Sequence, residues 1–299
     1  MIVVLYGTLL IGIVFPGPSA AMSRSIKYLM MTLLFLSFIK ISPADVGRAL
    51  MSNWAGIIRG TLLRLIIAPV VAYWVTLALY PPLALPMLLL AGVSTGVSSP
   101  FFTSLCRGDI SYSLVMAVVT SLILPISLPV MVKLLAHVTL DYALTDMALF
   151  LAMIIFIPLG AAFVVRKLSP GLLGPLDRMS YPISLVVLVG INFGALGRYL
   201  PYLKANPEQI LYCVVYSIGL SLMLAILGWG LARSRSWANR VAASGSQVWG
   251  NNILIIALAV DMNQPLAATL SVLYLIPFYA FVVFFSTLAN RAAPAPAAG

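Results

Sequence analysis

Charge is what this sequence has least of. Only 8% of its 299 residues are charged, against about a quarter in an average soluble domain, and 62% are hydrophobic. The seven acidic residues and the one histidine all lie outside the hydrophobic part of the apolar segments. This composition excludes a soluble protein and predicts an all-α polytopic membrane protein that has the lipid bilayer as a partner. It also leaves no carboxylate proton relay inside the membrane.

Cysteine is scarce as well. Cys106 and Cys213 are isolated in apolar surroundings, so we expect neither a disulfide framework nor a metal site. No nucleophile, base and orienting residue form a recognisable trio, so we expect neither an enzyme nor a cofactor. The formal net charge of +10 would suggest nucleic acid in a soluble protein. In a membrane protein, excess Lys and Arg belongs to cytoplasmic loops, and we therefore expect no nucleic-acid partner.

Apolar segments of membrane-spanning length are abundant. A crossing needs about 20 apolar residues, and the chain divides into five spans within residues 1–137 and five within 138–291. Most of the 17 Lys and Arg residues fall on the side of the two termini, which predicts that both termini are cytoplasmic. The small, proline-rich residues 292–299 predict a disordered tail. The predicted spans are 1–15, 26–41, 54–80, 83–106, 110–136, 142–165, 179–197, 209–232, 237–260 and 265–289.

Two of these spans are interrupted by small and polar residues. The fourth is interrupted over 92–100 and the ninth over 244–252, and each ends in an aspartate, Asp109 or Asp261. Non-helical backbone at bilayer depth requires cover by protein or a watery cavity, and transporters built from inverted repeats carry such breaks in both halves. Because five crossings invert the second half, we predict two inverted five-helix repeats whose broken helices 4 and 9 cross near the midplane.

Polar side chains gather at both interruptions. Ser98 and Ser99 lie in the first, and Asn251 and Asn252 lie in the second. The serines could merely hydrogen-bond to the preceding turn, and the asparagines could merely join helices. Their clustering at matched breaks favours a substrate-binding site, at which positive helix ends and free amides would attract an anionic group.

Arg64 is the strongest departure from an apolar helix, because it lies inside the run LLRLIIAPVV of the third span. An arginine there costs at least ~2.5 kcal/mol on insertion scales. Its side chain could extend along the helix to the cytoplasmic interface. It could instead be a fixed cation held by carbonyls of the broken helices, or bind the anionic group of a substrate. We favour the last two interpretations, which are compatible.

Three passages resemble the bile acid:sodium symporter family. They are residues 28–46, which end in a Ser-Pro-x-Asp turn, residues 98–109 with the paired prolines Pro125 and Pro129 further on, and residues 250–259. The resemblance implies ten helices in a panel domain (spans 1, 2, 6 and 7) and a core domain (spans 3–5 and 8–10). It also implies alternating access and a bacterial inner-membrane location.

The resemblance further implies where sodium ligands would lie, and most of them are altered. Ser113 retains the family's residue, whereas Ser246 stands where the family has a glutamate. Sodium requires several hard oxygens, ideally including a carboxylate, and that carboxylate is missing. The ion-binding positions implied by the resemblance are Arg64, Ser99, Pro100, Ser113, Ala117, Ser246 and Gly250.

Together these features predict a secondary transporter of a small organic anion or amphipathic solute, working by uniport or exchange and not coupled to sodium in the usual way. A sodium-coupled bile acid or organic anion symporter with a modified ion site is an alternative. A non-transporting membrane receptor or ligand sensor on the same fold is another. The related arsenite-efflux family uses a cysteine at the fourth-span break, but Cys106 lies two turns beyond that break, which disfavours this activity.

Overall fold

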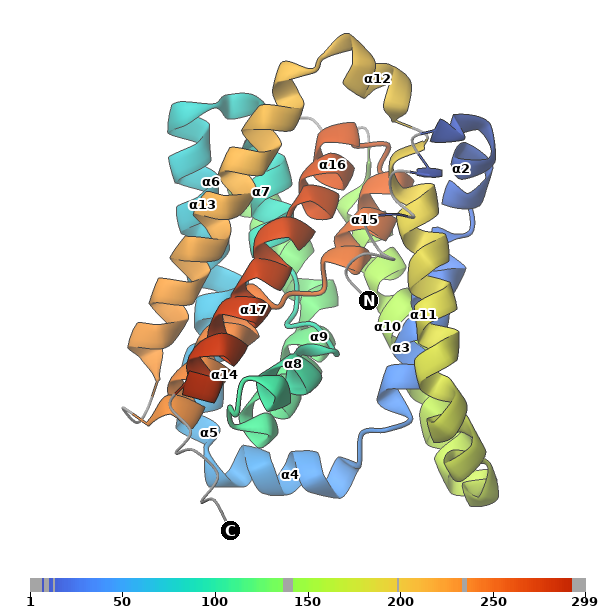
Figure 1. The fold of residues 1–299 in the computed structure, drawn as a ribbon, viewed down its shortest axis with the longest axis vertical. Coiled ribbons are helices and arrows are strands. Elements are labelled where there is room, and N and C mark those ends of the chain that lie inside the picture. The colour runs from blue at the N-terminus through green and yellow to red at the C-terminus, as the bar shows by residue number, and fades with distance from the viewer. Residues whose placement is uncertain are drawn as a thin grey trace.

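The protein is described by a computed structural model that covers residues 7, 11–12, 14–136, 142–197, 199–232 and 236–291. These residues form helices and connecting turns, without a β-strand. Figure 1 shows the helices arranged along the long axis of the molecule, with α12 at one end and α4 at the other. The predicted first span lies mostly outside the described residues, and the predicted tail lies wholly outside them.

The chain up to residue 136 contains one long helix broken by a wide turn, and one span broken into two short helices. The long helix consists of α5, the π-helical turn η1 and α6, and the divided span consists of α7 and α8. The elements are α2 (Pro16–Ser23), α3 (Ile26–Phe38), α4 (Pro43–Ser52), α5 (Trp54–Leu62), η1 (Leu63–Ile67), α6 (Ala68–Leu79), η2 (Pro81–Leu83), α7 (Ala84–Ala91), α8 (Ser99–Leu105) and α9 (Ile110–Leu135).

The chain from residue 142 onward follows a similar order, with a second divided span formed by α14 and α15. The elements are α10 (Leu144–Leu168), η3 (Pro170–Leu172), α11 (Leu173–Gly197), α12 (Leu200–Ala205), α13 (Glu208–Leu231), α14 (Trp237–Val248), α15 (Asn252–Asp261), α16 (Pro265–Leu273) and α17 (Leu275–Arg291). Prolines occur inside α9, α10 and α11, as is common in membrane-spanning helices.

Six helices of the described residues are long and apolar enough to cross a membrane, and a seventh is obtained if α3 and α4, bent by 74°, count as one. The prediction of an all-helical membrane protein is confirmed. The number ten stays a prediction, because the divided fourth and ninth spans each consist of two short helices. The inverted repeat stays a prediction as well.

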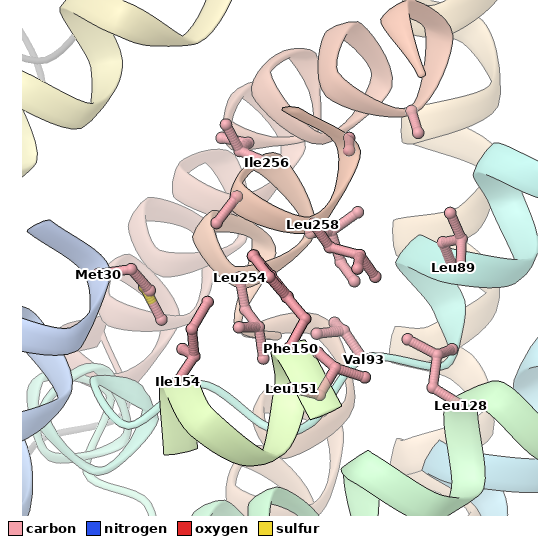
Figure 2. Packing of buried hydrophobic residues seen from close by; sticks show 14 of the residues in the cluster. Met30, Leu89, Val93, Leu128, Phe150, Leu151, Ile154, Leu254, Ile256 and Leu258 are labelled. Carbon is pink, nitrogen blue, oxygen red and sulfur yellow. The ribbon is translucent and has the colours of Figure 1, made fainter. Parts of the chain in front are cut away.

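The core surrounds α15. Leu254, Ile256 and Leu258 of this helix are fully buried, and Figure 2 shows them among side chains from α3, α7, α9 and α10, including Met30 and Phe150. An apolar helix in a membrane protein can face lipid or other helices, and the burial of α15 shows that other helices cover it. Packing by several helices therefore fixes the position of α15, and with it the position of the break that precedes α15.

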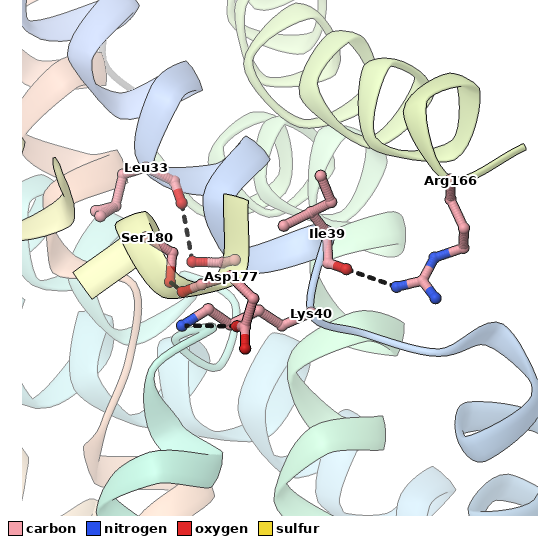
Figure 3. Close-up of polar contacts among 7 residues, drawn as sticks. Leu33, Ile39, Lys40, Arg166, Asp177 and Ser180 are labelled. Carbon is pink, nitrogen blue, oxygen red and sulfur yellow. Dashed lines mark hydrogen bonds and ion pairs between the residues drawn. The ribbon is translucent and has the colours of Figure 1, made fainter. Parts of the chain in front are cut away.

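Two groups of helices flank this core. In one group α11 packs against α2 and α3, and α3 packs against α10. Arg166 of α10 ties this group together, since its Nη2 donates to the carbonyl oxygens of Ile39 at 2.5 Å and Ile41 at 3.1 Å, at the bend between α3 and α4. Figure 3 shows the first of these bonds. In the other group α13 packs against α14, and α6 packs against α7. The division into a panel and a core domain stays a prediction.

Candidate functional site

Two breaks in helices meet back to back. The first break covers residues 92–98, between α7 and α8, and the second covers residues 249–251, between α14 and α15. Thr95 and Gly250 form an antiparallel bridge. The amide of Gly96 donates to the Trp249 carbonyl at 2.8 Å, and the amide of Asn251 donates to the Ser94 carbonyl at 2.9 Å. Each break therefore satisfies backbone groups that the other leaves open.

The second break is shorter than its polar sequence predicts. Ser244 and Ser246 belong to the last turns of α14, which remains helical as far as Val248. Their hydroxyls bond to neighbouring helices. For example, Ser244 Oγ donates to the Ala225 carbonyl of α13 at 3.0 Å. Pro100 lies at the second position of α8, where a missing N–H costs nothing. It therefore begins a helix and does not interrupt one.

The carbonyls at the end of α14 are all bonded by groups from outside the helix. The Ser246 carbonyl accepts from Thr95 Oγ1 at 2.8 Å, and the Val248 carbonyl accepts from Tyr274 Oη at 2.9 Å. The Gln247 carbonyl accepts from Arg64. A helix C-terminus carries a partial negative charge and unpaired carbonyls, so the end of α14 is a site that favours a cation.

Arg64 provides that cation. Its side chain is only 1% exposed, its Nε donates to the Val93 carbonyl at 2.7 Å, and its Nη1 donates to the Gln247 carbonyl. The guanidinium thus joins the carbonyls that follow α7 to those that end α14. The interpretation that this side chain extends to the membrane interface is wrong, because both helix breaks surround it.

The local backbone explains how Arg64 reaches the breaks. It lies in the wide turn η1, which follows the regular helix α5. Pro69, the second residue of α6, comes two residues after the end of η1. Proline lacks an N–H and its ring clashes with the carbonyl four residues earlier, so the helix cannot keep its regular bonding here. In this π-helical segment three consecutive residues, Leu63, Arg64 and Leu65, are buried in the interior.

Gly250 allows the guanidinium to come this close. A Cβ atom placed on Gly250 would collide with Nη2 of Arg64, and one placed on Gly96 would lie 2.9 Å from the Trp249 carbonyl oxygen. Neither position could hold a side chain without displacing a neighbour. The crossing is therefore built around two glycines for reasons of space, since neither has a positive φ.

A cavity of about 380 Å³ lies beside the crossing. One wall comes from α3 and α11, and the opposite wall comes from the two breaks, α8, α15 and α17. Most of its lining is apolar, with side chains such as Leu33, Leu188 and Phe278. Among the predicted substrate-binding residues, Ser98, Asn251 and Asn252 line the cavity, whereas Arg64 and Ser99 are not among the lining residues.

The two asparagines carry unpaired polar atoms into this wall. Asn251 is 6% exposed and Asn252 is 2% exposed. Nδ2 of Asn251 and both polar side-chain atoms of Asn252 have no hydrogen-bond partner within the described part of the chain. Buried polar groups are almost always satisfied, so these amides are available to bond to a polar group or a water molecule in the cavity.

Several of the positions that the resemblance associates with sodium lie close to other hydroxyl groups, and others have no suitable oxygen. Thr103 Oγ1 lies 2.7 Å from Ser113 Oγ, and Ser246 Oγ donates to Ser113 Oγ at 3.2 Å. Ala117 is fully buried, but its methyl group cannot be a ligand. The hydroxyl of Ser99 is buried and has no partner within the described residues. Of these predicted ion positions, Ser99, Ser113 and Ser246 carry a hydroxyl oxygen, Ala117 carries none, and no carboxylate is among them.

Sequence reasoning missed several residues of the site. Val93 and Gln247 act through backbone carbonyls, which no side-chain pattern reveals. Thr95 and Tyr274 bond to α14, and only the first had a signal, because it lies inside the predicted interruption. Cys106 is fully buried with its Sγ toward the Val282 carbonyl at 3.7 Å, and it does not line the cavity. No cluster of metal-ligating residues occurs in the described ranges.

Comparisons with known proteins identify the family of the chain. A search among curated proteins finds no match for the chain. A family model described as the sodium bile acid symporter family matches residues 27–204, more than half of the chain. The match contains the first break and Arg64 but ends before the second break. Members of this family are membrane transporters and not enzymes. The chain therefore belongs to the sodium bile acid symporter family.

Proposed function

We propose that the protein is a secondary transporter that carries a small organic anion or amphipathic solute by alternating access, without the usual coupling to sodium. The observation that carries this proposal is the buried guanidinium of Arg64, bonded to the Val93 and Gln247 carbonyls. In transporters with broken helices, such carbonyls and helix ends hold the coupling cation. Arg64 supplies a permanent positive charge at that place, so no free cation is needed to hold the crossing together.

The adjoining cavity supplies the solute site. One wall of the cavity comes from α3 and α11, and the other comes from the crossing together with α17. A movement of α3 and α11 against the helices of the crossing would close the cavity on one side of the membrane and open it on the other side. Alternating access operates in this way. The unpaired amides of Asn251 and Asn252 suit a hydroxyl or carbonyl group of the solute, and the apolar lining suits its hydrocarbon body.

Counterflow tests the transport claim. Liposomes that contain the purified protein are loaded with unlabelled cholate, the conjugate base of a simple bile acid, and diluted into a trace of labelled cholate. We expect transient accumulation of the label, because a carrier exchanges bound solute across the membrane without an imposed ion gradient. Protein-free liposomes and an Asn251→Leu, Asn252→Leu variant are the controls. Binding of cholate without any exchange would instead identify a receptor or sensor.

One observation favours a second candidate function, a sodium-coupled symporter with a modified ion site. The hydroxyls of Thr103, Ser113 and Ser246 lie together at 2.7 and 3.2 Å, and all three side chains are buried. Hydroxyl oxygens can bind sodium, although a set without a carboxylate leaves the charge of the ion unbalanced. These hydroxyls also satisfy one another, which removes the need for an ion.

Replacing sodium by potassium separates the two candidates. We expect the melting temperature of the purified protein and the dissociation constant for cholate to be the same in both salts at equal ionic strength, because Arg64 already provides the positive charge. Choline chloride serves as the control for a general salt effect. A saturable stabilisation that occurs with sodium and not with potassium would show that the hydroxyl cluster binds the ion.

A further inference from the structure

Among the described residues that line the cavity beside the crossing, one side chain is charged. Lys40 lines the cavity, together with uncharged residues from all the contributing helices, and no carboxylate is among the lining residues. Arg64 lies nearby in the fold but donates its protons to carbonyls of the breaks and does not line the cavity. Lys40 is therefore the lining residue that can balance the charge of a bound anion.

Lys40 and the two asparagines lie at different depths. The side chain of Lys40 is 47% exposed, whereas Asn251 and Asn252 are almost fully buried. Lys40 follows the end of α3, close to the bend that leads into α4 (Figure 1). The cavity thus has an accessible rim with a positive charge and a buried wall with neutral amides. Between these two polar regions the lining is mostly apolar.

The ammonium group of Lys40 has a weak partner in this structure. Its Nζ lies 3.7 Å from Oδ1 of Asp177 on α11, and the Asp177 side chain is 68% exposed. Figure 3 shows the pair at the edge between α3 and α11. An ion pair this long and this exposed contributes little stability. A competing anion can therefore replace Asp177 at little cost.

We propose that Lys40 is the charge-selecting residue of this cavity: its ammonium exchanges Asp177 for the anionic group of the solute when the solute binds. The inference rests on the proposed function and makes it more specific. The solute class is an amphipath with an anionic group at one end, an apolar body, and a hydroxyl or carbonyl group at the other end. The anionic group lies at the exposed rim beside Lys40, and the neutral polar group lies against Asn251 and Asn252.

Matched probes test this assignment. Dissociation constants are measured by calorimetry on the full chain in phosphatidylcholine nanodiscs, for cholate and for its neutral carboxamide, which differ only in charge. A shorter pair, octanoate and octanamide, is measured in parallel. We expect Lys40→Gln to weaken binding of the anionic probes about fivefold and to leave the neutral probes unchanged. Asp177→Asn should tighten binding of the anionic probes about twofold, because it removes the competing carboxylate.

A control variant and the salt dependence sharpen the test. Lys167→Gln removes an exposed basic residue that does not line the cavity, and it should change no dissociation constant. The effect of Lys40→Gln should shrink as salt is raised, since exposed charges are screened. Equal weakening of anionic and neutral probes, or no weakening of either, would overturn the role of Lys40 and leave the proposed function standing. Failure of the parent protein to bind any of the four probes would overturn both.

Discussion

Replacing Arg64 with glutamine is expected to lower the free energy of unfolding by about 1.5 to 3 kcal/mol, the contribution of a hydrogen bond that involves a charged group. The side chain is fully enclosed and donates to the Val93 and Gln247 carbonyls. Glutamine is shorter and can reach only one of them. The other carbonyl would be left buried and unpaired, which alone costs about 1 to 3 kcal/mol. The measurement is a denaturant titration of the purified protein in detergent, with melting temperature as a second readout.

Two further variants show whether the loss of stability comes from the guanidinium of Arg64. Arg64→Lys keeps the charge but lacks the planar fork that reaches two acceptors, so it should recover only part of the loss. Arg59→Gln is the matched control, because Arg59 lies on the same long helix, is exposed, and within the described residues donates its side-chain hydrogen bond to the Ala55 carbonyl of its own helix. We expect it to change stability by less than about 0.5 kcal/mol. If Arg64→Gln unfolds at the same denaturant concentration as the parent protein, the guanidinium does not hold the two breaks together.

Cholate affinity of the Arg64→Gln variant is informative as well. Because Arg64 does not line the cavity, we expect its loss to act mainly on folding, and on binding only through the position of the breaks. A variant that folds normally yet loses binding of anionic but not neutral probes would instead place the guanidinium in contact with the solute.

The second large effect is expected for Gly250→Ala. A Cβ atom at this position would collide with Nη2 of Arg64 and lie 3.1 Å from Cγ1 of Val93. The guanidinium cannot retreat without losing its carbonyl partners, so we expect a loss of about 3 kcal/mol, the upper range for overpacking of a well-packed core. Denaturant titration again provides the value. Gly219→Ala is the control, since nothing lies within 4 Å of a Cβ atom there and alanine is the better helix former.

A double-mutant cycle assigns the cause of that loss. Residues in direct contact show coupling energies of about 0.5 to 3 kcal/mol. Combining Gly250→Ala with Arg64→Lys should therefore cost less than the sum of the single changes, because the lysine has no Nη2 to collide with the new methyl group. Strict additivity would mean that the alanine disturbs the backbone of the break and not the guanidinium.

The sequence by itself determined the class of the protein and the places where its helices fail. Few charges and long apolar segments leave a chain no stable arrangement except helices in a bilayer, and the structure has such helices. The polar run at 92–100 predicted an interruption, because glycine, serine and proline weaken a helix wherever they occur together. The cost of a buried arginine marked Arg64 before any partner was known.

Only the tertiary structure decided what the polar residues do. Ser244 and Ser246 belong to a regular helix, and their hydroxyls bond to other helices at 3.0 and 3.2 Å. A sequence pattern cannot distinguish such a serine from one in an unwound turn. The partners of Arg64 are backbone carbonyls from two segments far apart in the chain, and every residue type carries a carbonyl. Lys40 lines the cavity because α3 and α11 pack side by side. Contacts of this kind depend on which faces meet, and local composition does not encode that.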